Sequence, residues 1–212
     1  MKTVYLIRHG EANANVGPRY EGGDSALTEH GKKQAQLLAM RAKRLPIDVL
    51  ISSPMRRTRE TAEIISKHIR KPIEFSEIFE ERHIPTALDG RKREDADATR
   101  LMDEWCATFT TNHSRILDGE NFADIYERAG RAISFLEKRP EDHILMIGHG
   151  FFSKMIIARI FFGDTLTPEI FRPFEYGMRT KNTGLSILQY NPDDKHKVPW
   201  WLSVWNDHTH LG

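Results

Sequence analysis

Cysteine is almost absent from this chain of 212 residues, which contains only Cys106. A single thiol cannot form an intramolecular disulfide, and we expect Cys106 to be a packing residue on a helix. We expect no secretory signal, because the apolar stretch Thr3–Ile7 is short and is followed at once by Arg8 and His9. These absences predict a soluble protein of the reducing cytoplasm.

An excess of charge of either sign is also missing. Lys and Arg total 31 against 30 Asp and Glu, so the formal net charge is only +1. No global field therefore favours nucleic acid or an anionic membrane surface. The most apolar stretch, Met155–Phe162, is interrupted by Arg159 and is far too short to span a bilayer. We expect neither nucleic acid nor a membrane as a partner, and any affinity for anions must be local.

Continuous apolar runs indicate the strands. The runs Thr3–Ile7, Asp48–Ile51 and His143–Ile147 lack the polar alternation of half-exposed strands. This pattern is typical of strands buried on both faces of a parallel sheet. Thr183–Tyr190 is predicted to add another strand. Since 39% of the residues are apolar, the chain can bury one core, and we expect a single domain over residues 1–212.

Helical patterns lie between these strands. Thr28 is predicted to be the N-cap of a helix that ends near Arg44, and Ser53 the N-cap of a helix whose first residue is Pro54. Amphipathic or apolar spacing predicts two more helices, Phe122–Leu136 and Phe151–Phe162. The alternation of strands and helices predicts an α/β fold, a three-layer α/β/α sandwich with a mostly parallel central sheet.

Polar motifs follow the three apolar runs directly. They are Arg8-His9-Gly10, Ser52-Ser53 leading to Arg57, and Gly148-His149-Gly150. The carboxyl ends of parallel strands meet at one edge of an open α/β sheet, and ligands bind there. We therefore expect these side chains to form one site. The segment 82–112, charged at first and compatible with a helix later, is predicted to cross this face.

The residue types in these motifs suit a phosphoryl group. The guanidinium forks of Arg8 and Arg57 match phosphate oxygens, and a helix beginning at Pro54 would aim free N–H groups at the same place. A neutral imidazole is a competent nucleophile when an acceptor holds one ring nitrogen and nearby arginines discourage its protonation. His9 fits this role best, with His149 beside it. No Asp-rich cluster accompanies them, and we expect neither a metal nor a cofactor.

These motifs resemble, in the same order, those of the histidine phosphatase superfamily, the phosphoglycerate mutase-like family. Arg8-His9-Gly10-Glu11 is similar to the family's RHG motif. The resemblance continues through four further stretches, Leu27–Gly31 with Gln34-Ala35, Ser52–Thr58, Glu80–Arg82 and Gly148–Gly150. It spans most of the chain and implies a phosphoglycerate mutase-like fold. One departure is Ile84-Pro85, where many relatives have a glycine after the acidic motif.

The resemblance implies a role for each motif residue. His9 would become phosphorylated, while Glu81 would donate a proton to the leaving oxygen and then activate water. Glu80 is the alternative proton donor. The implied catalytic residues are Arg8, His9, Arg57, Glu81 and His149. The implied substrate-binding residues are Arg8, Asn15, Gly22, Gly23, Arg57, Arg82, His149 and Gly150, with the loop Tyr20–Gly23 lining the pocket.

Three functions are compatible with these residues. The first is a histidine acid phosphatase-type phosphoric monoester hydrolase that acts on a small phosphorylated metabolite. The second is a cofactor-dependent phosphoglycerate mutase, and the third is a phosphate-binding module without turnover. The excursion between Glu81 and His149 is shorter than in those mutases, which leaves a more open pocket and favours hydrolysis. The substrate depends on how residues 84–118 fold, and the oligomeric state stays open between monomer and homodimer.

Other conspicuous residues have simpler interpretations. Aromatic residues near a C-terminus usually dock the tail onto the core, and we expect this of Trp200, Trp201 and Trp205. His208 and His210 lack a matched set of ligands elsewhere, so a metal bound there would be adventitious. The basic run 91–93 could grip a second anionic group, but a solvated loop is the favoured interpretation.

Overall fold

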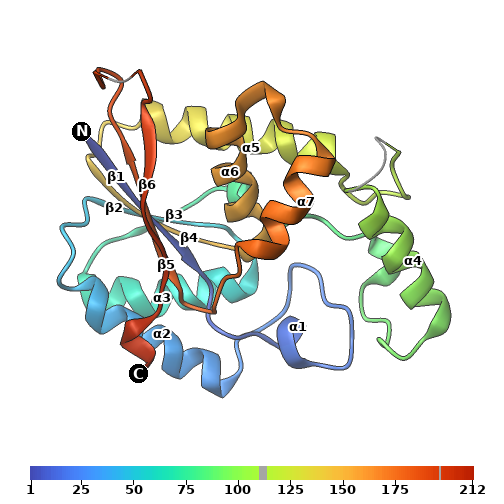
Figure 1. Cartoon of the computed structure of the whole chain (residues 1–212). Helices are drawn as coiled ribbons and strands as arrows, with labels where there is room; N and C mark the ends of the chain where they lie inside the picture. The colour runs from blue at the N-terminus through green and yellow to red at the C-terminus, as the bar shows by residue number, and fades with distance from the viewer. Residues whose placement is uncertain (110–113, 196) are drawn as a thin grey trace.

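The computed structural model of the protein describes residues 1–109, 114–195 and 197–212, and its centre is a six-stranded mixed sheet (Figure 1). The strand order is β3-β2-β4-β1-β5-β6. Neighbouring pairs among β3, β2, β4 and β1 are parallel, whereas β5 and β6 run antiparallel to their neighbours. The strands are β1 (Lys2–Arg8), β2 (Val49–Ser52), β3 (Ile73–Phe75), β4 (His143–Gly148), β5 (Leu185–Tyr190) and β6 (Trp200–Asp207). The predicted mostly parallel sheet is confirmed.

Helices cover both faces of this sheet and complete three layers (Figure 1). On one face lie α2 (Glu29–Ala42) and α3 (Arg56–Ile69), and on the other lie α5 (Phe122–Lys138) and α6 (Gly150–Phe162). The remaining helical elements are α1 (Asn13–Val16), α4 (Ala96–Ala107), α7 (Pro168–Gly177), η1 (Glu77–Phe79), η2 (Thr86–Leu88), η3 (Gly163–Thr165) and η4 (Thr209–Leu211). No helix within the described ranges has the length and hydropathy that a membrane span requires.

The apolar runs are strands because both of their faces are buried. In β1, Val4 and Leu6 pack into the core beneath α5 and α6, whereas Tyr5 and Ile7 pack into the core beneath α2 and α3. Alternate side chains of a strand point to opposite faces, so a strand between two cores needs apolar residues at every position. This explains why the sequence shows no alternation there.

The predicted helix starts are right for α2 and wrong for α3. Thr28 is the N-cap of α2, and its hydroxyl accepts a hydrogen bond from the Gly31 N–H. By contrast α3 begins at Arg56, two residues after Pro54, with Met55 as its N-cap. The physical reason is that the Ser53 side chain is engaged elsewhere, by the imidazole of His149 and the Met55 N–H.

The C-terminal tryptophans belong to the sheet, which confirms the predicted docking of the tail. They lie on β6, which pairs antiparallel with β5. Trp200 is only 4% exposed, packs against the Tyr190 ring and donates its indole N–H to Glu137.

The segment 82–112, which was predicted to cross the face of the site, contains α4. Its residues 110–112 lie outside the described residues.

Candidate active site

The three polar motifs meet where β1, β2 and β4 end. Arg8 is paired with Gly148 in the parallel register of β1 and β4. The His9 N–H donates to the Gly148 carbonyl at 3.0 Å, and the imidazole rings of His9 and His149 lie 5.2 Å apart, centroid to centroid, edge to face. The structure thus brings both histidines to one edge of the sheet.

His9 is held as a neutral imidazole with one defined tautomer. Its side chain is almost completely buried, and its Nδ1 lies 2.7 Å from the Gly10 carbonyl oxygen. A carbonyl can only accept, so Nδ1 carries the proton and Nε2 keeps its lone pair. Burial, together with the positive charges of Arg57 and Arg8, holds the pKa of His9 well below its ordinary value. Nε2 therefore has the form that a nucleophile requires.

His149 is buried beside it and paired with a serine. Its Nε2 lies 3.0 Å from Ser53 Oγ. Burial, followed by the charge of Arg57, lowers the pKa of His149 well below its ordinary value. The Ser53 hydroxyl can donate its proton to Nε2, which leaves the imidazole proton on Nδ1. Among the described residues this buried Nδ1 has no hydrogen-bond partner, so it is available to an oxygen of a ligand.

Two arginines supply the positive charge. Arg8 donates to the Thr180 carbonyl at 2.8 Å, and its buried Nε has no acceptor within the described ranges. Arg57 is 6% exposed and donates to the Gly22 carbonyl at 2.7 Å. Burial lowers the pKa of both guanidinium groups, but arginine stays protonated at any working pH. An unpaired buried donor costs about 1–3 kcal/mol, and an anionic oxygen would relieve that cost.

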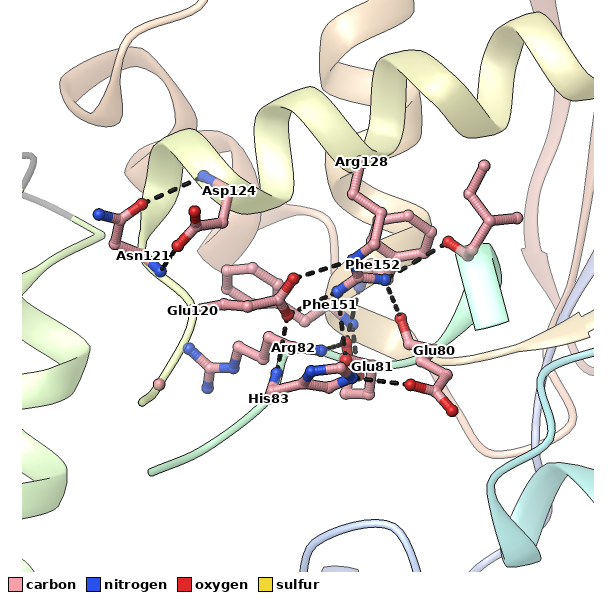
Figure 2. Close-up of polar contacts among 12 residues, drawn as sticks. Glu80, Glu81, Arg82, His83, Glu120, Asn121, Asp124, Arg128, Phe151 and Phe152 are labelled. Carbon is pink, nitrogen blue, oxygen red and sulfur yellow. Dashed lines mark hydrogen bonds and ion pairs between the residues drawn. The ribbon is translucent and has the colours of Figure 1, made fainter. Parts of the chain in front are cut away.

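Of the two candidate glutamates, Glu81 is the one beside the histidines. Its Oε1 accepts from the Phe152 N–H at 2.9 Å and from the Arg82 N–H at 3.1 Å, and its Oε2 accepts from the Phe151 N–H at 3.1 Å (Figure 2). Phe151 and Phe152 belong to the first turn of α6, where backbone N–H groups have no acceptor within the helix. Glu80 instead contacts His83 Nε2 at 2.7 Å.

A cavity and a larger cleft adjoin at this site. The His9 cavity, of about 330 Å³, is lined by Arg8, His9, Ala14, Asn15, Glu21, Arg57, Glu81, Arg82, Gly150, Phe151, Lys154, Glu175 and Thr180. The outer cleft, of about 750 Å³, shares Glu21, Arg57, Glu81 and Arg82 with it. Gly22, Gly23 and Glu80 line only the outer cleft. The fully buried His149 lines neither cavity.

The other predicted binding residues take different positions around the His9 cavity. Asn15 is oriented through its Oδ1, which accepts from the Ala12 N–H at 3.0 Å and from Asn182 at 3.3 Å. Gly150 lies so close to Arg8 and Thr180 that a Cβ would sit 2.9 Å from Thr180 Oγ1. Tyr20 does not line either space, because it is buried against Leu88 and Ala98. The predicted lining by Tyr20 is therefore wrong.

Several residues of the cavity were absent from the sequence prediction. Thr180 precedes β5, and β5 runs antiparallel to β1, so the start of β5 lies beside the end of β1. Lys154 and Glu175 form an ion pair at the cavity wall between α6 and α7. A single charged residue inside the largely apolar segment 151–158 was the available signal for Lys154. The antiparallel arrangement that brings in Thr180 had no such signal.

The predicted anion site at a helix N-terminus is not present in the expected form. The N–H of Arg56, the first residue of α3, donates to the Gly23 carbonyl at 3.0 Å. At the start of α6, Glu81 occupies the N–H groups of Phe151 and Phe152. Positive charge at the site therefore comes from side chains.

The basic run and the tail histidines have structural partners. Arg91 pairs with Asp95, and Arg93 donates to the carbonyls of Ala14 and Gly17. His208 contacts the Asn206 carbonyl, and His210 contacts Thr183 Oγ1. Within the part of the chain that the structure describes, no group of three or more His, Cys, Asp or Glu side chains is arranged to hold a metal ion.

Gly31 holds the His9 loop against α2, and we expect Gly31→Ala to disturb both stability and activity. A Cβ at Gly31 would lie 2.0 Å from the Glu11 carbonyl oxygen, so backbone must move. Overpacking of this kind costs about 1–3 kcal/mol, and displacement of the loop should also lower kcat/KM. Thermal unfolding and turnover measure the two effects. Gly177→Ala is the matched control, since nothing lies within 4 Å of a Cβ there; equal behaviour of both variants would contradict the prediction.

Burial of neutral histidines predicts a loss of stability in mild acid. His9 and His149 have folded-state pKa values well below their ordinary ones. Below a pH of about 6.5 the unfolded chain binds protons that the folded chain does not. The free energy of unfolding should therefore fall by up to about 1.4 kcal/mol per pH unit for each histidine. Urea titrations between pH 7.5 and 5 measure the slope, and His9→Gln should make it shallower. An unchanged slope in that variant would refute the assignment.

Comparison with known proteins agrees with this geometry. Residues 4–207 match the histidine phosphatase superfamily (branch 1). A relative from Salmonella arizonae named "Probable phosphoglycerate mutase GpmB" is 30% identical, with 100% of this chain and 95% of the relative covered. The solved structure of Bacillus stearothermophilus YhfR is 27% identical with a TM-score of 0.81, covering 100% of both chains. The Shigella flexneri α-ribazole phosphatase has a TM-score of 0.79 at 24% identity, covering 97% of this chain and 96% of that one.

The family match extends over nearly the whole chain, from β1 to the end of β6. It includes both histidines, both arginines and Glu81, which lie within the matched residues. The fold agrees as well, since the two solved structures superpose over almost their full lengths. The chain belongs to the histidine phosphatase superfamily (branch 1) and is an enzyme.

Proposed function

We propose that this enzyme is a cytoplasmic phosphomonoester phosphatase that works without a metal, through a phosphohistidine on His9. The observation that carries the proposal is the state of His9. Its Nδ1 proton is held by the Gly10 carbonyl, and burial, together with the charges of Arg57 and Arg8, lowers the pKa of His9 so that the ring stays neutral. A lone pair on Nε2, next to two guanidinium groups, is suited to attack phosphorus.

The first step transfers the phosphoryl group to the enzyme. His9 Nε2 forms a bond to phosphorus while the bond between phosphorus and the leaving oxygen breaks. Glu81 gives its proton to that oxygen, so the alcohol leaves neutral. Oε2 of Glu81 accepts a single hydrogen bond from the described residues, and it has a lone-pair site left for this proton. Arg8 and Arg57 neutralise the charge on the phosphoryl oxygens, and the Nδ1 proton of neutral His149 is a hydrogen-bond donor for one of them.

The second step releases phosphate. Glu81, now ionised, takes a proton from a water molecule, and the water oxygen attacks phosphorus. The N–P bond breaks, its electron pair returns to Nε2, and inorganic phosphate leaves. His9 is neutral again and Glu81 is protonated, so both residues are ready for another substrate.

The outer cleft supports hydrolysis of a substrate with a sizeable alcohol portion. Its volume of about 750 Å³ lies within the range of small-molecule sites and exceeds what the phosphoryl group alone needs. Its lining carries side chains of both signs, among them Arg59, Glu80 and Asp89. Such a wall suits a hydroxyl-bearing metabolite, and its opening gives water a route to a phosphohistidine. A mutase must exclude that water.

Phosphate release distinguishes this proposal from the mutase. The purified enzyme, in EDTA, is given p-nitrophenyl phosphate and a panel of sugar, nucleotide and glycerol phosphates, and free phosphate is measured. Metal-independent release supports a phosphatase. Interconversion of phosphoglycerates without net release would establish the mutase instead, which is the activity that the Salmonella relative's name suggests. No turnover in either assay would leave phosphate binding as the function.

A further inference from the structure

A buried ion pair lies next to the segment that carries Glu81 (Figure 2). Arg128 of α5 and Glu120 are only 8% and 13% exposed in their side chains. Arg128 Nε donates to Glu120 Oε1 at 2.9 Å, and Arg128 Nη2 donates to Glu120 Oε2 at 2.7 Å. The pairing is bidentate, which fixes the plane of the guanidinium group.

The rest of this guanidinium group holds backbone carbonyls. Arg128 Nη1 donates to the Glu80 carbonyl at 2.6 Å and to the Ile78 carbonyl at 3.4 Å, and Nη2 donates to the Glu81 carbonyl at 3.2 Å. The donors of one side chain thus bind the backbone carbonyls on both sides of the Glu81 Cα. No other arginine of the described chain contacts this segment in the same way.

Glu120 fastens the other end of the segment. Its Oε2 accepts from the His83 N–H at 2.8 Å, and its own N–H donates to the His83 carbonyl at 3.0 Å. The Trp105 indole N–H donates to the Glu120 carbonyl at 2.8 Å. Arg128 and Glu120, here called the acid clasp, therefore form hydrogen bonds with the backbone of residues 78–83 on both sides of Glu81.

The acid clasp also touches the helix that binds the Glu81 carboxylate. The Arg128 guanidinium lies 4.2 Å from the centroid of the Phe152 ring, and the Phe152 N–H donates to Glu81 Oε1. The start of α5 is fixed by a capping box between Asn121 and Asp124. Arg128, a residue of α5, thus contacts both the backbone of Glu81 and one of the residues whose N–H groups bind its carboxylate.

A buried ion pair of this kind has little value for stability alone. Well-packed apolar residues in its place are often neutral or stabilising, because burying two charges costs as much as their attraction returns. Geometry is what the acid clasp supplies, since an apolar pair could not hold four backbone groups at once. We infer that Arg128 and Glu120 are positioning residues that keep the Glu81 carboxyl group where it can protonate the leaving oxygen, an inference that rests on the proposed function.

The leaving group separates positioning of the acid from general support of the fold. Nitrophenolate leaves readily without a proton, whereas an alkoxide requires one. Loss of the acid clasp should therefore lower kcat/KM for glycerol phosphate by about 10–100-fold, because a displacement of about 1 Å can cost that much. The effect on kcat/KM for p-nitrophenyl phosphate should be less than about threefold, because kcat/KM reports the departure of the alcohol and not the later attack of water.

The test uses variants that avoid an orphaned charge. Arg128→Met alone leaves Glu120 buried and unpaired, which destabilises the fold, so the main variant is Arg128→Met with Glu120→Met. Adding the two clasp substitutions to Glu81→Gln should cause no further loss with glycerol phosphate, since the acid clasp acts through Glu81. Arg139→Met, which removes an arginine that pairs with Glu74 and Glu141, is the matched control remote from Glu81. Equal losses on both esters, or additive losses with Glu81→Gln, would overturn the inference.

Amide hydrogen exchange tests the same inference without any activity. The N–H groups of Phe151 and Phe152 should lose protection in the clasp variant and keep it in Arg139→Met, while the strands stay protected in both. Unchanged protection at these two amides would overturn the inference. If the wild type hydrolyses neither ester, the proposed function fails, and exchange still decides whether the acid clasp holds Glu81.

Discussion

Replacing His9 with alanine is expected to reduce phosphate release by about 10⁵-fold or more, on the scale seen when a covalent nucleophile is removed. The side chain is the only part of His9 that supplies a nucleophile, whereas its backbone N–H keeps its bond to Gly148 in the variant. The phosphoryl clamp of Arg8 and Arg57 remains, so binding of phosphate should persist while turnover disappears. Turnover is measured by phosphate release in EDTA, and binding by calorimetry with inorganic phosphate.

The control for His9→Ala is His30→Ala, which removes an exposed imidazole on α2. It should leave turnover unchanged. Brief incubation of the wild type with labelled substrate, followed by denaturation, should trap an acid-labile phosphoryl group on His9. Residual activity of the His9 variant within tenfold of the wild type, or a label on another residue, would exclude the phosphohistidine mechanism.

Glu81→Gln is expected to slow hydrolysis of alkyl phosphates by about 10²–10⁴-fold, the usual contribution of a general acid. The amide can still accept one N–H from α6 through its oxygen, but it has no proton to give at the leaving oxygen. The loss in kcat/KM should shrink sharply with p-nitrophenyl phosphate, whose leaving group departs as an anion. Steady-state kcat/KM on the two esters measures the contrast, because it does not include the later attack of water.

Glu80→Gln is the matched comparison, one residue away in the same segment. Its carboxylate contacts His83 and lines only the outer cleft. It should therefore show no dependence on the leaving group. If Glu80→Gln produced the contrast and Glu81→Gln did not, the proton donor would be Glu80, and the acid clasp would lose the residue through which it acts.

Local patterns in the sequence were enough for three of the four parallel strands, β1, β2 and β4 but not β3, and for the core of the site. Continuous apolar runs identified β1, β2 and β4, because strands between two cores carry apolar residues on both faces. Thr28 identified the start of α2, because capping is a contact over three residues. The carboxyl-edge rule then brought His9, Arg8 and His149 to one place.

Tertiary structure alone decided which hydrogen-bond partners the residues of the site have. Ser53 caps no helix because its hydroxyl contacts His149, 96 residues away in the sequence. Arg128 holds Glu81 from 47 residues away, and Thr180 reaches Arg8 across 172 residues. Periodicity and capping are short-range signals that report burial and helix ends. Which donor meets which acceptor depends on how α5, α6 and the antiparallel β5 pack around the sheet, and no local pattern records that.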